Sequence, residues 1–277
     1  MRGYSLQHNR WLEFVVDSVE DIAWNAHAFE SLVLPDNYKE MILAVSESQA
    51  ENRQSYDDVI QGKGRGVILL VAGPPGVGKT LTAEAVAEQM QVPLIKFKTS
   101  SAGSKLEEAL SRVLELAGRW KAILLLDECD IFLEQRSTQD FERNTVVAMF
   151  LQKLEYYEGI LFMTTNRPDN IDPAIRSRIH LTMQYPDLTS LARRKLWCNF
   201  LKDGDHSLGE ADYDELAEID LNGRQIKNVI KIGHLLARRK LVPVNRAILK
   251  MVLDVEGINM EPRVQDDQQN GKRCATS

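Results

Sequence analysis

The sequence predicts an α/β protein: a five-stranded parallel sheet with helices on both faces, followed by a small all-α domain at the carboxyl end. Up to residue 186, short apolar runs alternate with stretches of helical periodicity, the pattern of repeated strand–helix units. The run at residues 67–72 is apolar on both faces, as expected at the centre of a parallel sheet. After Pro186 the helical pattern continues and the strand pattern does not return.

The expected elements of the first part follow in order along the chain. Residues 1–31 have no sustained periodicity and are interpreted as an entry segment, and the helical pattern after them places Tyr38, Ile42 and Val45 on one face. A glycine-rich breaker cluster at residues 62–66 precedes the first strand. The expected strands are residues 67–72, 93–97, 122–127, 160–165 and about 179–184. The expected helices are residues 80–91, 105–117 and 143–155.

The second part is expected to hold four helices. They lie at residues 188–202, 212–219, 224–240 and 244–255. In the third helix Ile226, Val229, Ile230 and Gly233 recur at helical spacing, so one face of it is apolar. The end of the chain is polar and poor in large apolar residues, which predicts a disordered tail. The expected division is an entry segment at 1–31, an α/β domain at 32–186, a helical domain at 187–256 and the tail at 257–277.

Composition restricts the class of protein. The 277 residues carry 34 Lys and Arg against 40 Asp and Glu, a net charge of −6, with 44% hydrophobic and 27% charged residues, as in ordinary soluble domains. The acidic balance and the absence of a long basic block make nucleic acid an unexpected partner. No apolar run approaches the ~20 residues of a membrane span, and no signal-peptide core is visible. We therefore expect an intracellular, soluble protein, with cytoplasm and nucleus not distinguished.

A phosphate-binding motif directly follows the first buried strand and opens the next helix. Its glycines let backbone N–H groups curl around phosphates, Lys79 adds a positive charge, and the Thr80 hydroxyl is a ligand for Mg²⁺. The alternative interpretation is a Gly/Pro turn before a helix. The expected nucleotide-binding residues are Gly73, Pro74, Pro75, Gly76, Val77, Gly78, Lys79, Thr80, Leu81 and Asp127.

Two adjacent acids end the buried strand at residues 122–127. Ligands bind at this edge of open α/β sheets, so Asp127 is expected in the Mg²⁺ shell and Glu128 is expected to polarise the attacking water. The alternative is a strand that simply runs into solvent at its charged end. The second acid favours hydrolysis of a nucleotide over binding alone.

These motifs resemble the AAA+ ATPase superfamily of P-loop NTPases, and the resemblance covers roughly residues 30–255. Residues 124–136, 143–144 and 154–161 are similar to the AAA-type core of large fungal ATPases of undefined role. The resemblance implies ATP and Mg²⁺ as cofactors, a helical lid after the α/β domain, a ring of subunits, typically a hexamer, and an unknown protein substrate. Residues 99–104 lack the aromatic pore loop that many AAA unfoldases carry.

The resemblance also implies further catalytic residues. Asn166 matches the polar sensor that holds the attacking water, although it would also suit a turn before Pro168. Arg178 matches an arginine that reaches a neighbouring subunit's site, with Arg176 as a competing candidate and an ordinary surface arginine as the alternative. Arg224 matches the second sensor, or is an exposed arginine at a helix start.

The expected function is Mg²⁺-dependent ATP hydrolysis that drives remodelling of a partner by an oligomer. One alternative is an ATP-loaded scaffold with negligible hydrolysis. Another is a P-loop kinase, which the pair Asp127–Glu128, the Asn166 sensor and the helical lid argue against.

Overall fold

The computed structural model describes residues 1–34, 36–51, 64–98, 106–133, 141–202 and 204–258. It divides the chain into two compact units, Met1–Asp187 and Leu188–Ser277, each of which is described by itself. The expected disordered tail lies outside the described residues except for 257 and 258, and so do residues 99–104. No helix in the described ranges is long and apolar enough to cross a membrane.

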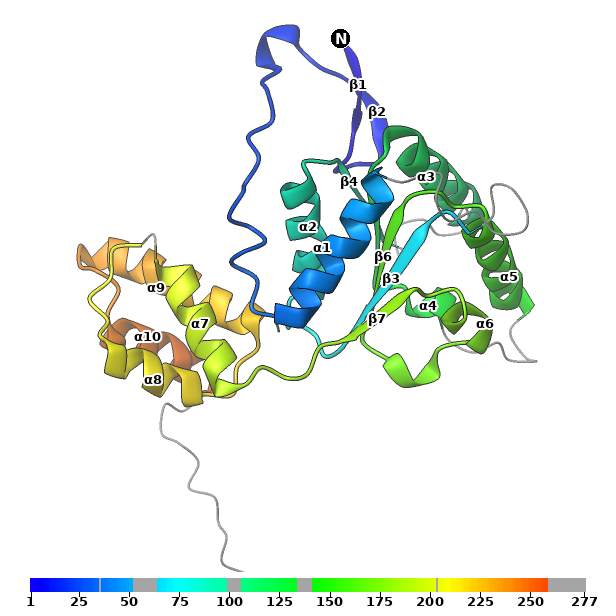
Figure 1. The fold of residues 1–277 in the computed structure, drawn as a ribbon. Coiled ribbons are helices and arrows are strands. Elements are labelled where there is room, and N and C mark those ends of the chain that lie inside the picture. The colour runs from blue at the N-terminus through cyan, green and yellow to red at the C-terminus, as the bar shows by residue number, and fades with distance from the viewer. Residues whose placement is uncertain (35, 52–63, 99–105, 134–140, 203, 259–277) are drawn as a thin grey trace, which may run out of the picture. The chain divides into compact units, whose positions relative to one another are not determined.

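The first unit is built on a five-stranded sheet with the order β4-β5-β6-β3-β7 (Figure 1). Every neighbouring pair in this sheet is parallel. The central strands are apolar on both faces up to the polar residues Asp127, Thr164 and Thr165 at their carboxyl ends, as expected where both faces of a sheet are covered, and all residues of β5 and β6 are buried. The predicted five-stranded parallel sheet is thus confirmed. The strands are β3 (Val67–Ala72), β4 (Leu94–Lys98), β5 (Ile123–Asp127), β6 (Ile160–Thr165) and β7 (Leu181–Gln184).

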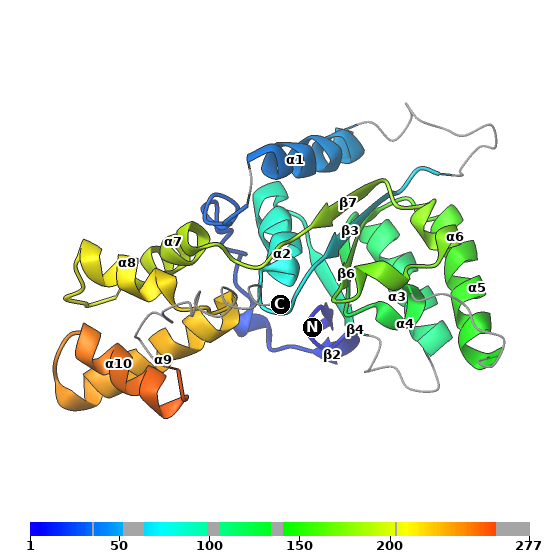
Figure 2. The same cartoon turned by 90° about the horizontal axis from the view of Figure 1, so that it is seen from below.

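Helices cover both faces of this sheet (Figure 2). On one face α1 (Asp36–Glu51) and α2 (Lys79–Met90) pack over alternate residues of β3, including Leu69 and Val71. On the other face α3 (Leu106–Trp120), α4 (Asp130–Leu133) and α5 (Phe141–Glu155) pack over Ile68 and Leu70. A short helix α6 (Pro173–Arg176) follows the 3-10 turn at Pro168–Asn170. Adjacent residues of one strand therefore belong to two different apolar cores, one on each face of the sheet.

The entry segment contains a hairpin that the periodicity of the sequence did not predict. Its strands β1 (Arg2–Ser5) and β2 (Arg10–Glu13) pair antiparallel. Tyr4 and Trp11 pack edge to face with each other and with Trp120 of α3, with ring centroids 5.0 to 6.4 Å apart. Asn9 in the turn donates from Nδ2 to the carbonyl of Lys96 in β4, at 2.7 Å. The hairpin is stabilised by contacts with residues that are distant in sequence. Its strands have four residues each, too few to produce a periodic pattern of apolar residues that would predict them.

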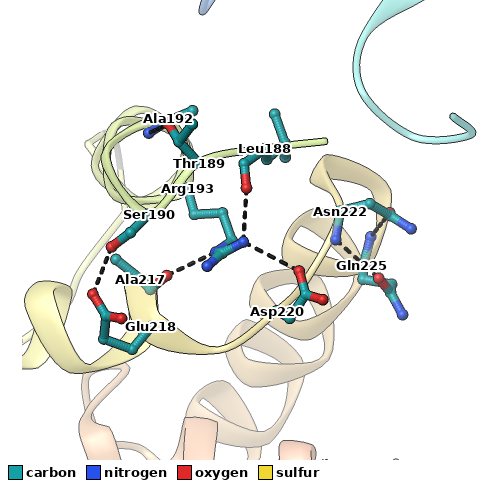
Figure 3. Close-up of polar contacts among 10 residues, drawn as sticks. All are labelled: Leu188, Thr189, Ser190, Ala192, Arg193, Ala217, Glu218, Asp220, Asn222 and Gln225. Atoms are coloured by element: carbon teal, nitrogen blue, oxygen red, sulfur yellow. Dashed lines mark hydrogen bonds and ion pairs between the residues drawn. The ribbon is translucent and has the colours of Figure 1, made fainter. Parts of the chain in front are cut away.

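In its described residues, the second unit has four helices around one apolar core. They are α7 (Ser190–Leu201), α8 (Glu210–Glu218), α9 (Gly223–Lys240) and α10 (Arg246–Val255), and the fully buried Trp197 lies in their core. Figure 3 shows how their connections are held. Arg193 donates to the carbonyls of Leu188 and Ala217, both at 2.7 Å, and to Asp220 at 3.2 Å. Asn222 and Gln225 form a reciprocal capping box that fixes the start of α9.

Candidate nucleotide-binding site

The loop between β3 and α2 is shaped by glycines that no other residue could replace without strain. Gly73 has a φ of +150° and Gly78 a φ of +104°, and both lie outside the range that L-residues prefer. A Cβ on Gly73 would lie 2.3 Å from the carbonyl oxygen of Tyr185, which follows β7 and donates its own N–H to Ala72 at 2.7 Å. The main chain at Gly73 therefore runs directly against the residue that follows β7.

The Lys79 side chain lies across this loop. Its Nζ donates hydrogen bonds of 2.7 Å to the carbonyls of Gly73 and Pro74 and to Oδ1 of Asn166, and the residue is only 8% exposed. Asn166 follows the last residue of β6, the strand paired with β3. The parallel sheet thereby joins two residues that the sequence placed in one site.

Asp127 lies at the end of β5 with both of its carboxylate oxygens near donors. Oδ1 accepts from the hydroxyls of Thr80, at 2.9 Å, and Thr164, at 2.7 Å, while Oδ2 is 3.9 Å from Nζ of Lys98. Thr164 and Lys98 were not predicted as site residues. The register of the sheet explains their position: Lys98 is the partner of Asp127, and Leu126 pairs with Met163, the residue before Thr164. The sequence did offer a signal for them. Each strand next to the one that ends in Asp127 has a polar residue near its own end.

Glu128 leaves the strand in an unusual conformation. Its φ of +54° is left-handed, which costs a non-glycine residue about 1 kcal/mol. Its backbone N–H donates to Oγ1 of Thr164 at 2.9 Å, and the next N–H, of Cys129, donates to the Thr164 carbonyl at 3.0 Å. The Thr164 contacts hold this turn, and the Glu128 residue itself is exposed at the sheet edge. The thiol of Cys129 is fully buried and burial raises its pKa, so it is no nucleophile.

Two of the arginines that the resemblance singled out belong to the first unit, and the third belongs to the second unit. Arg178 donates from Nη1 to the carbonyl of Ala174 at 2.7 Å, and its Nη2 is 2.5 Å from Oε1 of Glu155 in the same chain. Arg176 is exposed and its side chain makes no hydrogen bond or ion pair with any residue in the described ranges. Arg224 is exposed in the first turn of α9, in the second unit. Within the first unit, the cluster at the loop thus contains Lys79, Thr80, Asp127, Glu128 and Asn166, and neither Arg176 nor Arg178 forms a hydrogen bond or ion pair with it in the described residues.

The donor set suits a hard cation. The Thr80 hydroxyl and the Asp127 carboxylate, which lie 2.9 Å apart, offer the oxygen ligands that Mg²⁺ prefers. Within the described ranges, no three His, Cys, Asp or Glu side chains are grouped so that they could hold a metal. Mg²⁺ commonly keeps several waters and binds through one or two protein groups together with substrate phosphates. The residues present therefore fit a cation that arrives with a nucleotide.

A glycine-rich loop between a central parallel strand and a helix, with its lysine and with acids at the end of another strand of the same sheet, defines the P-loop NTPase fold. Residues 69–187 match the family described as "ATPase family associated with various cellular activities (AAA)". This part of the chain belongs to the AAA family, within the AAA+ superfamily.

Named relatives agree with this assignment. The chain is 30% identical over 190 residues to the ATPase family AAA domain-containing protein FIGL1 of Arabidopsis thaliana, covering 63% of this chain and 28% of that protein. It is 32% identical over 191 residues to the ATP-dependent zinc metalloprotease FtsH of Mycobacterium leprae, covering 62% of this chain and 24% of that protein. The chain thus spans less than a third of either relative. The crystal structure of the FIGL-1 AAA domain in complex with ADP aligns with a TM-score of 0.64 at 18% identity, covering 86% of both chains.

Proposed function

We propose that this chain binds ATP with Mg²⁺ and hydrolyses it. The observation that carries the proposal is the grouping of Lys79, Thr80, Asp127 and Asn166 at one edge of the sheet. The three acceptors of Lys79 described above are neutral oxygens, and a nucleotide phosphate competes well with them for the ammonium because a charged acceptor forms the stronger hydrogen bond. The known AAA domain of FIGL-1 is named as an ADP complex, which supports the choice of nucleotide.

Each residue of the cluster has a role in this proposal. Backbone N–H groups from Gly76 to Thr80 hold the phosphates, while Thr80 and Asp127 hold Mg²⁺, whose charge stabilises the phosphoryl group during transfer. Glu128, on the exposed turn after β5, accepts a proton from the attacking water. Asn166 orients that water from the neighbouring strand. The roles of Arg178 and Arg224 are carried over from the AAA+ resemblance: Arg178 acts on a neighbouring subunit's nucleotide and Arg224 senses the nucleotide from the helical lid.

An arginine supplied by a neighbour implies an oligomer, and we propose a ring, as a hexamer, that remodels a protein partner. Arginines supplied in this way raise the rate of phosphoryl transfer about 10³ to 10⁵-fold in well-studied systems. The test is steady-state ATP hydrolysis over a series of protein concentrations, with light scattering on the same samples. Turnover per subunit that rises with concentration and collapses in Glu128→Gln and Arg178→Ala supports an active site shared between subunits.

A second candidate is an ATP-loaded scaffold with negligible hydrolysis. The ion pair of Arg178 with Glu155 of its own chain favours it, because a guanidinium held there does not serve a neighbouring site. This candidate predicts ATP binding with a slow turnover that is flat across protein concentration and unchanged in Glu128→Gln. The same experiment therefore separates the two functions.

A further inference from the structure

A ten-residue segment before α1 exposes apolar side chains in a row. We call residues 15–24 the strap, which follows β2 as a 3-10 turn at Val16–Ser18 and then an irregular chain (Figure 1). It is anchored before and after: Phe14 exchanges main-chain hydrogen bonds with Met1, and the Asn25 N–H donates to Glu88 of α2 at 2.8 Å. Every residue of the strap except Trp24 is exposed. Its large aliphatic side chains, which are 54 to 69% exposed, are Val15, Val16, Val19 and Ile22.

The strap is also acidic. Between Arg10 and Lys39 the chain has no Lys or Arg but six acids. Three of them, Asp17, Glu20 and Asp21, lie between the exposed valines and the isoleucine, and their side chains have no hydrogen-bond or ion-pair partner in the part of the chain that the structure describes. Apolar side chains in such number, exposed together and interleaved with unpaired charge, are typical of an interaction surface.

The second unit carries a surface of the opposite charge. Between Asp220 and Asp254 the chain has eight Lys and Arg and no acid. The buried side of α9 is apolar, and its exposed side, which we call the α9 face, combines basic and apolar residues. The α9 face comprises Lys227, Lys231, Ile232, Leu235, Arg238 and Arg239. Ile232 and Leu235 are 41% and 62% exposed, and the four basic side chains have no partner among the described residues.

We propose that the strap of one copy of this chain docks on the α9 face of a second copy. Valine and isoleucine side chains of the strap would cover Ile232 and Leu235, while the strap acids would pair with the basic residues around them. Complementary charges of this kind steer association and suppress wrong partners. Because each copy carries one strap and one α9 face, the contact is head to tail, and its repetition produces a closed ring or an open filament. The inference rests on the oligomeric part of the proposed function and names its contact.

The test reverses the charge of each surface in turn. One variant carries Asp17→Lys, Glu20→Lys and Asp21→Lys, and the other carries Lys231→Glu, Arg238→Glu and Arg239→Glu. Self-association is measured by sedimentation velocity over a concentration series, with and without MgATPγS. Each variant alone is expected to associate at least about tenfold more weakly than the wild type, because like charges then face each other. Thermal unfolding establishes that each variant is folded.

Mixing the two variants gives the decisive result. In a 1:1 mixture the basic strap of one variant meets the acidic α9 face of the other, and the two unaltered surfaces also meet, so both contacts are complementary again. Association of the mixture is expected to return to within about threefold of the wild type, and added salt should weaken it. The apolar part of the contact is tested by Val15→Ser, Val16→Ser and Val19→Ser, which should also weaken association.

A control with the same change of charge is Glu107→Lys, Glu108→Lys and Glu115→Lys on the exposed side of α3, which should associate like the wild type. Wild-type-like association of the strap variant, or a mixture that stays dissociated, overturns the proposed contact while the oligomer itself stands. A wild type that is monomeric at every concentration overturns both the contact and the oligomeric part of the proposed function. ATP binding by that monomer would leave the nucleotide site unaffected.

Discussion

Lys79 and Asn166 lie 87 residues apart in the chain, yet 2.7 Å separates Nζ of the first from Oδ1 of the second. The contact exists because β3 and β6 are neighbouring parallel strands, so the helix that follows one strand begins beside the end of the other. Asn166 uses its carbonyl oxygen for this bond. Its amide nitrogen has no partner among the described residues and can donate to a water or a phosphate oxygen.

Asn166→Ala should separate nucleotide binding from hydrolysis. Lys79 keeps its two carbonyl acceptors, so we expect ATP affinity to stay within about threefold, whereas turnover should fall at least about tenfold because the water loses an orienting group. Isothermal titration and steady-state turnover measure the two effects. Gln152→Ala, which removes an exposed amide on α5, is the matched control and should change neither. Equal losses of affinity and turnover would instead assign Asn166 to ground-state binding.

Thr164→Val should destabilise the fold and disturb the site together. The hydroxyl of the buried Thr164 donates to Asp127 and accepts from the N–H of Glu128, so its removal takes a donor from a buried carboxylate and an acceptor from a partly buried N–H. We expect a loss of about 1 to 3 kcal/mol in the free energy of unfolding, measured in urea. Thr182→Val, on an exposed residue of β7, should stay within about 0.5 kcal/mol of the wild type. Equal stability of the two variants would contradict the role given to the Thr164 hydroxyl.

Gly73→Ala and Gly118→Ala form a second matched pair. The first places a Cβ 2.3 Å from the Tyr185 carbonyl at a φ of +150°, whereas a Cβ on Gly118, in the helix α3, meets nothing within 4 Å. We expect Gly73→Ala to cost at least about 3 kcal/mol of stability, and Gly118→Ala to add up to about 1 kcal/mol, because alanine is the better helix former. Thermal unfolding with and without ATP checks both values. A Gly73→Ala protein as stable as the wild type would show that the loop does not need this close approach to β7.

Most strands and helices could be predicted along the chain because they are longer than four residues or carry a strong local pattern, whereas the four-residue helices α4 and α6 were not predicted. Residues Leu69 to Ala72 are apolar on both faces of the strand, and this property can be recognised in the sequence alone. The loop residues around Lys79 were equally predictable, because the glycine spacing is local. The hairpin that packs Trp11 against Trp120 was not, since its partner lies in α3 and its strands have four residues each.

The finer contacts of the site depend on register, which the sequence does not contain. Thr164 lies beside Asp127 only because Leu126 pairs with Met163, and a shift of one residue would have turned the hydroxyl to the other face of the sheet. The ion pair between Arg178 and Glu155 likewise joins the segment after α6 to the last residue of α5. Motif spacing singled out Arg178 and gave no indication of this partner.

His180 should make stability depend on pH near neutrality. Its Nδ1 accepts from the N–H of Ile68 at 3.0 Å, so this nitrogen must be unprotonated, and burial lowers the pKa of the imidazole below its ordinary 6.5. A lowered pKa in the folded state means that the stabilisation is present above pH 6.5 and is lost as the pH falls. We expect the midpoint temperature of thermal unfolding to decrease as the pH is lowered below 6.5. This decrease should be smaller in His180→Gln. Identical profiles for the two proteins would rule out this origin.

Arg178 and Arg176 should differ in what they stabilise. Arg178 bridges Glu155 and the carbonyl of Ala174 with a side chain that is 29% exposed, whereas Arg176 has no such partner. Arg178→Ala should therefore cost about 1 kcal/mol of stability, discounted for its partial exposure, and Arg176→Ala should cost less than about 0.5 kcal/mol. Urea unfolding of dilute protein measures both without the influence of association.

Glu155→Gln then tells whether Arg178 works within its own chain or for a neighbour. The substitution removes the ion pair but leaves the guanidinium in place and freer to move. If Arg178 is only structural, Glu155→Gln and Arg178→Ala lose similar stability and keep the same turnover per folded subunit. If it acts on the nucleotide of a neighbouring subunit, Arg178→Ala alone loses the turnover that rises with protein concentration, while Glu155→Gln retains it, because only the arginine stabilises charge in the transition state. Loss of that turnover in Arg176→Ala, with Arg178→Ala unaffected, would assign the role to Arg176 instead.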